Sequence, residues 1–128
     1  MTTKETGDKG ENLACEYLVE NGYKIIGRNY RIKFGEIDII CRKKLWTFDR
    51  TVHFVEVKTL RQAQGGAFFP EQRVDWKKQQ KVKRLAEIWL SKHKYPQDIP
   101  YQIDVIAVSG DPSSGSGQVD FFENVVSE

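Results

Sequence analysis

The chain has 128 residues, which is the size of one domain and enough to bury a hydrophobic core. Its 39% hydrophobic and 12% aromatic content excludes a disordered chain, and two cysteines are too few for a disulfide framework. The net charge of +2 decides nothing about partners. Since no apolar run approaches the length of a membrane span and no signal peptide opens the chain, we expect a cytoplasmic protein without a membrane partner.

A helix is expected first, beginning after Thr6 or Asp8 and ending at the Asn21-Gly22 pair. Its buried stripe would consist of Leu13, Ala14, Tyr17 and Leu18. Glu11 lies at the edge of this stripe in the first turn. On spacing alone, a carboxylate there does no more than complement the helix dipole.

Three consecutive strands, forming a meander, are expected between residues 23 and 60. They cover residues 23–30, 36–43 and 52–60. Three basic residues, Arg28, Arg31 and Lys33, accompany the first strand. These side chains could contact phosphates, or they could guard an outer strand against edge pairing.

The second and third strands, which read GEIDII and VHFVEVKT, carry acidic residues at related positions. Because successive side chains of a strand point to opposite faces, Glu36 and Asp38 share one face, as do Glu56 and Lys58. We expect the other face to hold Ile37, Ile39, Val55 and Val57. Antiparallel pairing would bring Asp38 and Glu56 toward a common point, with Lys58 two residues further along.

Two converging carboxylates beside an ammonium group suit a divalent cation such as Mg²⁺ or Mn²⁺, which is commonly held by one or two carboxylates plus substrate phosphate. Asp38 and Glu56 would supply the carboxylates and Val57 a backbone carbonyl. Lys58 would orient or deprotonate the attacking water, or neutralise the transition state. The carboxylates should raise each other's pKa until metal binds. The alternative is an ordinary half-solvated strand, where charged and apolar residues also alternate.

The clearest helix follows, from about Glu71 or Val74 to His93. Its core-facing stripe consists of Val82, Leu85, Ala86, Trp89 and His93, and continues backward to Lys78 and Gln79. Gln79 could hydrogen-bond a metal-bound water or a phosphate. Lys77 and Lys78 belong to a basic N-terminal half that suits a phosphate backbone, although a solvated lysine-rich face is the alternative.

Two further strands close the chain. YQIDVIAVS should run parallel to the third strand, since a helical crossover joins them, and VDFFENVV should form an edge strand. Asp104 could support the site or pair with a lysine. We expect His53 on the strand surface and His93 as a terminal polar residue, because no second histidine or cysteine stands at metal-ligand spacing.

The order of GDKGE, RNYR, GEIDII, FVEVKT, VDWKKQQK and QIDVIAV resembles the YraN-like family of small, largely uncharacterised bacterial proteins. That family is assigned a restriction-endonuclease-like fold, and the D…E-x-K pattern is similar to the PD-(D/E)XK nuclease signature, including that of archaeal Holliday-junction resolvases. The resemblance implies metal-binding and catalytic positions at Asp38, Glu56 and Lys58. It also implies that Glu11 is the helical acid of a resolvase-type site.

We therefore expect one α/β domain over residues 1–128, restriction-endonuclease-like, with a mixed sheet of four to five strands in the order α-β-β-β-α-β-β. Flexible segments are expected at residues 1–6, 61–70 and 109–117. The resemblance implies a metal-dependent endonuclease acting on DNA, perhaps at branched structures, and paired cleavage of a junction would require a homodimer. The alternatives are a non-catalytic nucleic-acid-binding module and an interaction domain that uses Phe68 and Phe69 of the second flexible segment.

Overall fold

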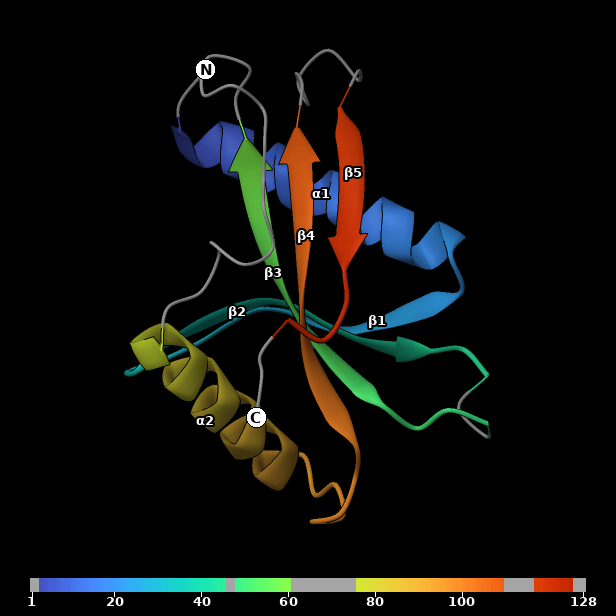
Figure 1. Cartoon of the computed structure of the whole chain (residues 1–128), viewed down its shortest axis with the longest axis vertical. Helices are drawn as coiled ribbons and strands as arrows, with labels where there is room; N and C mark the ends of the chain where they lie inside the picture. Colours follow the sequence, from blue (N-terminus) through green and yellow to red (C-terminus); the bar gives the residue numbers. More distant parts are fainter. Residues whose placement is uncertain (1–2, 46–47, 61–75, 110–116, 126–128) are drawn as a thin grey trace.

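The structure, a computed structural model, describes residues 3–45, 48–60, 76–109 and 117–125, with side chains omitted for residues 3–8, 60 and 76–79. Within these residues it contains two helices and five strands (Figure 1). In chain order they are α1 (Thr3–Glu20), β1 (Tyr23–Ile32), β2 (Gly35–Lys43), β3 (Val52–Leu60), α2 (Trp76–Lys92), β4 (Tyr101–Ser109) and β5 (Gln118–Phe122). The predicted α/β class, restriction-endonuclease-like, and its element order are confirmed.

The five strands form one mixed sheet in the order β1-β2-β3-β4-β5. β1, β2 and β3 pair antiparallel as the predicted meander, and β5 pairs antiparallel with β4. The central pair is parallel, because α2 carries the chain from the end of β3 back to the start of β4. β3 and β4 pair along their full lengths and lie near the middle of the sheet.

The two helices cover opposite faces of this sheet (Figure 1). The α1 face buries a cluster made of Ala14, Leu18, Tyr23, Ile39, Cys41, Val55, Ile106 and Val108. The α2 face buries a larger cluster that includes Ile37, Ile40, Val52, Phe54, Leu85, Ala86, Trp89, Leu90, Ile103 and Val105. Both faces of β3 are therefore covered, with Phe54 packed toward α2 and its neighbour Val55 toward α1. No helix in the described part of the chain is long and apolar enough to cross a membrane.

The β1–β2 hairpin is bent, and this overturns one expectation. Ile37 and Ile39 were expected on the same face, but Ile37 packs in the α2 cluster and Ile39 in the α1 cluster. The register of β1 against β2 shifts between Ile25 and Gly27, and Asn29 has a positive φ of 52°. Such irregularities bend and twist a strand pair. The bend brings the start of β2 against α2.

The first helix begins at Thr3, earlier than the start expected from its capping residues, and ends as expected before Gly22. Gly22 has a φ of 88°, a conformation that favours glycine after the last helical turn. Gly10 lies where α1 crosses β3, and a Cβ added to it would collide with the Thr59 hydroxyl. The missing side chain thus sets the distance between α1 and the sheet.

The second helix, Trp76–Lys92, lies inside the expected range. His93 is exposed just beyond it, as expected, with its ring stacked on Trp89 at 4.1 Å between centroids. The expected flexible segment at residues 61–70, which contains Phe68 and Phe69, lies outside the described residues.

Candidate functional site

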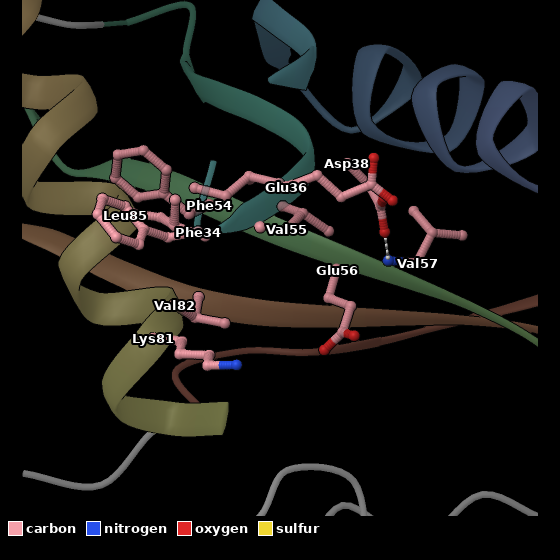
Figure 2. Close-up of a pocket in the computed structure, with 12 residues that line it drawn as sticks. Phe34, Glu36, Asp38, Phe54, Val55, Glu56, Val57, Lys81, Val82 and Leu85 are labelled. Carbon is pink, nitrogen blue, oxygen red and sulfur yellow. Dashed lines mark hydrogen bonds between the residues drawn. The ribbon is translucent and has the colours of Figure 1, made fainter. Parts of the chain in front are cut away.

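A cavity of about 660 Å³ opens between the start of β2, the middle of β3 and the N-terminal half of α2 (Figure 2). Its volume falls within the range of about 300–1,000 Å³ that is usual for ligand sites. The cavity is lined by Phe34, Gly35, Glu36, Ile37, Asp38, Phe54, Val55, Glu56, Val57, Lys81, Val82 and Leu85. Both predicted carboxylates and the residue between Glu56 and Lys58 therefore border one space.

Asp38 stands where β2 and β3 part. Their backbone pairing begins at Ile39 and Val55, and beyond it the Val57 N–H donates to the Asp38 carboxylate at 2.8 Å. Burial raises the pKa of Asp38 above its usual value, and the Val57 hydrogen bond acts against this shift. The charges of Glu36 and Glu56 raise the pKa further. The carboxylates do raise the pKa of Asp38, but burial contributes more than they do.

Glu56 and Lys58 lie two residues apart on β3 and so point to the same face. The Lys58 ammonium lies 3.2 Å from a Glu56 carboxylate oxygen, with side chains 32% and 21% exposed respectively. In Figure 2 the Glu56 carboxylate extends toward α2, from which Lys81 reaches in its direction, while Asp38 turns to the Val57 amide. The two acids thus meet the cavity at different points.

The donor set of this cavity is limited. Among the described side chains, no group of three or more histidines, cysteines, aspartates and glutamates could hold a metal ion. A cation bound here would be held by Asp38 and Glu56 together with main-chain, water or substrate oxygens. That is the kind of set that Mg²⁺ accepts, because it commonly binds through one or two carboxylates.

Glu11 lies on α1 and does not line the cavity. Its carboxylate is 3.8 Å from the Arg28 guanidinium, which also donates to Asn12 at 3.0 Å, so Arg28 ties β1 to α1. Glu11 is next to Gly10, where α1 crosses β3 beside Thr59. The structure therefore brings Glu11 near the end of β3, outside the set of residues that line the cavity.

The other predicted basic residues lie around the hairpin and the start of α2. Arg31 donates to Glu36 through two nitrogens, at 2.8 and 3.1 Å, and this pair is exposed at the rim of the cavity. Lys33 is exposed in the turn before β2. The predicted accessories Lys77, Lys78 and Gln79 belong to the first turns of α2, but their side chains lie outside the described ones.

The uncharacterised protein family UPF0102 matches residues 10–108, which contain every element that lines the cavity. The chain belongs to this family. A UPF0102 protein of Caldicellulosiruptor bescii is 38% identical over 108 residues, which are 84% of this chain and 85% of the relative. One of Campylobacter lari is 39% identical over 105 residues, 82% of this chain and 84% of its own. The match confirms the resemblance to the YraN-like family, and the family's description names no activity.

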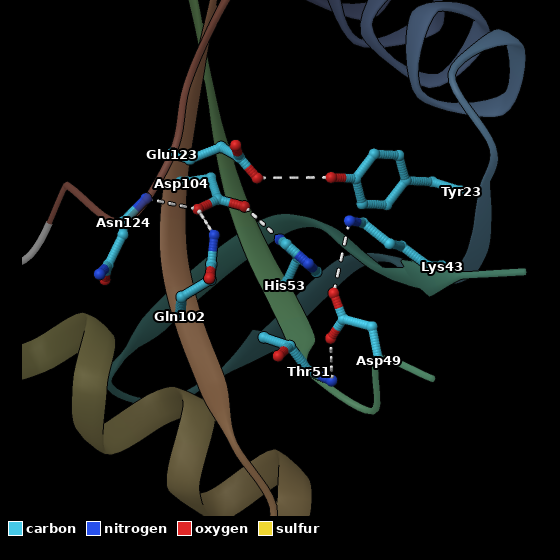
Figure 3. A network of polar contacts seen from close by, with 9 residues as sticks. All are labelled: Tyr23, Lys43, Asp49, Thr51, His53, Gln102, Asp104, Glu123 and Asn124. Carbon is cyan, nitrogen blue, oxygen red and sulfur yellow. Dashed lines mark hydrogen bonds and ion pairs between the residues drawn. The ribbon is translucent and has the colours of Figure 1, made fainter. Parts of the chain in front are cut away.

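A second polar cluster of this UPF0102 chain lies on the α1 face and was not predicted from the sequence (Figure 3). His53 is 2% exposed and Asp104 is completely buried, with 2.7 Å between Nδ1 and Oδ2. The other Asp104 oxygen accepts from Gln102 Nε2 at 2.9 Å and from the Asn124 N–H at 2.8 Å. The expectation of a surface His53 is wrong, because Tyr23 packs against its ring and both faces of β3 are covered.

One signal for this pair was present in the sequence. His53 and Asp104 interrupt apolar runs of two neighbouring strands, and a polar residue inside such a run needs a buried partner. The parallel register places Asp104 opposite Val55, two residues along β4 from Gln102, the partner of His53. Asp104 pairs with a histidine, so the lysine alternative is wrong.

Proposed function

We propose that this chain is a Mg²⁺-dependent or Mn²⁺-dependent endonuclease that hydrolyses DNA phosphodiester bonds, with branched DNA as its substrate. One observation carries the proposal: Asp38 and the E-x-K strand with Glu56 border one cavity at the point where two strands part. The PD-(D/E)XK resemblance supports the reaction type. The fold alone would not, because one fold hosts many functions.

The residues present fit a hard divalent cation. Burial raises the pKa of Asp38, which means that the metal-free protein stabilises the ionised carboxylate less well than water does. A cation held by Asp38, Glu56 and the Val57 carbonyl would compensate it. When bound, the cation would lower the pKa of a water and stabilise charge on the phosphoryl oxygens.

Lys58 would act on the nucleophile. Its ammonium lies 3.2 Å from Glu56, which lines the cavity, and its partial burial would keep its charge effective. From there Lys58 would orient the attacking water or neutralise charge in the transition state. Glu11 would be an outer metal ligand, and Gln79 would hydrogen-bond the metal-bound water or a phosphate. Mutagenesis of each residue tests these two roles.

Basic side chains around the cavity would hold the DNA backbone. Lys81 lines the cavity from α2, and Lys33 is exposed in the neighbouring turn. Lys77 and Lys78, in the first turns of α2, would extend this basic surface, and Arg31 would add to it beside Glu36. Such contacts position DNA without reading its sequence. Paired nicks in a junction would require two such sites, hence a homodimer on the DNA.

A non-catalytic nucleic-acid-binding module is the second candidate. The observation that favours it is that Lys58 pairs with Glu56 and the Val57 N–H donates to Asp38, so both acids have a partner within the protein. In that case the acids would be structural, and Arg28 and Arg31 with the basic start of α2 would bind phosphates.

The deciding assay is cleavage of a labelled four-way junction and of a linear duplex in Mg²⁺, Mn²⁺ or EDTA. The wild type should nick DNA only with metal, and Lys58→Ala should lower the rate by at least about 100-fold, as expected for loss of a catalytic group. Lys92→Ala, in the last turn of α2, is the matched control and should behave as wild type. Metal-independent retention of the junction without any cleavage would support the binding module instead.

A further inference from the structure

An exposed aromatic ring lies at one end of the cavity, and the proposed hydrolysis of a phosphodiester gives this ring no role. Phe34 occupies the turn between β1 and β2, lines the cavity, and is 51% exposed. Figure 2 shows it beside Phe54 and Leu85, at the end of the cavity away from the Asp38 carboxylate. The cavity therefore has an apolar end and an acidic end.

The ring is held in place from two sides. The Arg84 guanidinium of α2 lies over it, 5.1 Å from the ring centroid, which is a cation–π contact. The next residue, Gly35, has a φ of 150°, and a Cβ added there would meet a Leu85 methyl at 3.3 Å. The glycine thus lets the start of β2 lie close against α2, next to Phe34.

The surroundings of the ring match the parts of one nucleotide. A nucleobase can stack on an aromatic side chain whatever its sequence, because every base has a π-face. Arg84 beside the ring and Lys81 on the cavity wall carry positive charge suited to phosphate. Asp38 and Glu56, the two carboxylates proposed as metal ligands, line the cavity beyond this apolar end. A cavity of about 660 Å³ has room for such a group.

We propose that Phe34, held by Arg84, is the subsite for an unpaired nucleobase next to the bond that is cut. This inference rests on the proposed endonuclease function and specifies its substrate class: DNA with at least one unstacked nucleotide, such as a bulge, gap or branch point. A base inside a duplex must first be unpaired and unstacked to reach the ring, and this costs least where the base is already unpaired. The subsite thus selects irregular DNA.

The test uses two DNAs that differ in one unpaired 2-aminopurine, one bulged and one fully paired. Binding is measured in Ca²⁺, with the DNA checked to be intact, for wild type, Phe34→Leu and Phe34→Tyr. Leucine keeps the apolar bulk but removes the π-face, so it should weaken binding of the bulged DNA by about 5- to 150-fold, the range expected for one lost base stack. Binding of the paired DNA should change little. Tyrosine keeps the ring and should bind as wild type.

The 2-aminopurine emission reports stacking directly. It should change when wild type or Phe34→Tyr binds the bulge, and this change should be lost with Phe34→Leu. Phe48→Ala is the control, because Phe48 is also an exposed phenylalanine, at 88%, and does not line the cavity.

Two failures are distinguishable when cleavage in Mg²⁺ is measured on the same DNAs. Metal-dependent cleavage with equal preference for both DNAs in wild type and Phe34→Leu would overturn the subsite and leave the endonuclease in place. A wild type that neither binds nor cuts either DNA would overturn the endonuclease, and the subsite with it.

Discussion

Replacement of Asp104 by alanine tests the polar cluster around His53 and Asp104 on the α1 face of the sheet. The substitution removes the acceptor of three hydrogen bonds, from His53, Gln102 and Asn124. Gln102 is half-buried and Asn124 exposed, so water can replace part of what they lose, whereas His53 is 2% exposed and cannot recover. An unsatisfied buried polar group costs about 1–3 kcal/mol, and more for charged groups. We expect a loss of about 3 kcal/mol.

Urea unfolding followed by circular dichroism, without divalent metal, measures this loss as a free energy of unfolding. A loss of about 3 kcal/mol is a large part of the roughly 5–15 kcal/mol typical of a domain. Asp104→Asn should lose less than half as much, because one amide oxygen still accepts from Gln102 and Asn124. Asp120→Ala, an exposed aspartate on β5, should change stability by no more than about 0.5 kcal/mol. The reasoning is refuted if Asp104→Ala is as stable as the Asp120 control.

Burial raises the pKa of Asp38, so the stability that this shift provides is present below the unfolded pKa and lost as pH rises through the folded pKa. Metal-free Asp38→Asn should therefore be more stable than wild type at pH 7 and equal at about pH 3, near or below the usual aspartate pKa; lower stability at pH 7 in urea unfolding would contradict this. Gly10→Ala should lower the free energy of unfolding by about 1–3 kcal/mol, because the added methyl group would collide with Thr59. In thermal unfolding, Thr59→Ala in the same chain should reverse most of this loss. Additive losses in the double variant would contradict the clash. Burial also raises the pKa of the Cys15 and Cys41 thiols, which lowers their reactivity. A thiol reagent should label the half-buried Cys15 slowly and the buried Cys41 only when the protein unfolds. Rapid labelling of Cys41 in the native protein would contradict this and show that the α1 face opens.

The element order and the central pair of acids could be predicted because they depend on local periodicity. Alternation along a strand places Glu56 and Lys58 on one face whatever surrounds them, and the helical crossover makes β4 parallel to β3. The meander then places Asp38 on the neighbouring strand. That much of the site follows from the sequence without knowledge of the tertiary structure.

The remaining features depend on contacts between distant elements. The alternation of β2 breaks between Ile37 and Ile39, opposite Asn29 with its positive φ on β1, and a strand pattern does not encode this break. The burial of His53 depends on the cover that α1 and Tyr23 provide. Phe34 and Lys81 line one cavity only because the bent β1–β2 hairpin packs against α2. A sequence read strand by strand contains no direct signal for such crossings.

The most direct test of the account is metal binding. Calorimetric titration of the wild type with Mg²⁺ and with Mn²⁺ should show one site per chain, strongly weakened in Asp38→Asn and in Glu56→Gln, while Glu16→Gln on the exposed side of α1 binds as wild type. Loss of metal binding in both Asp38→Asn and Glu56→Gln would establish Asp38 and Glu56 as the ligands of one cation. A wild type that binds neither metal, or cavity variants that bind as well as it does, would contradict the metal site and leave the acids a structural role.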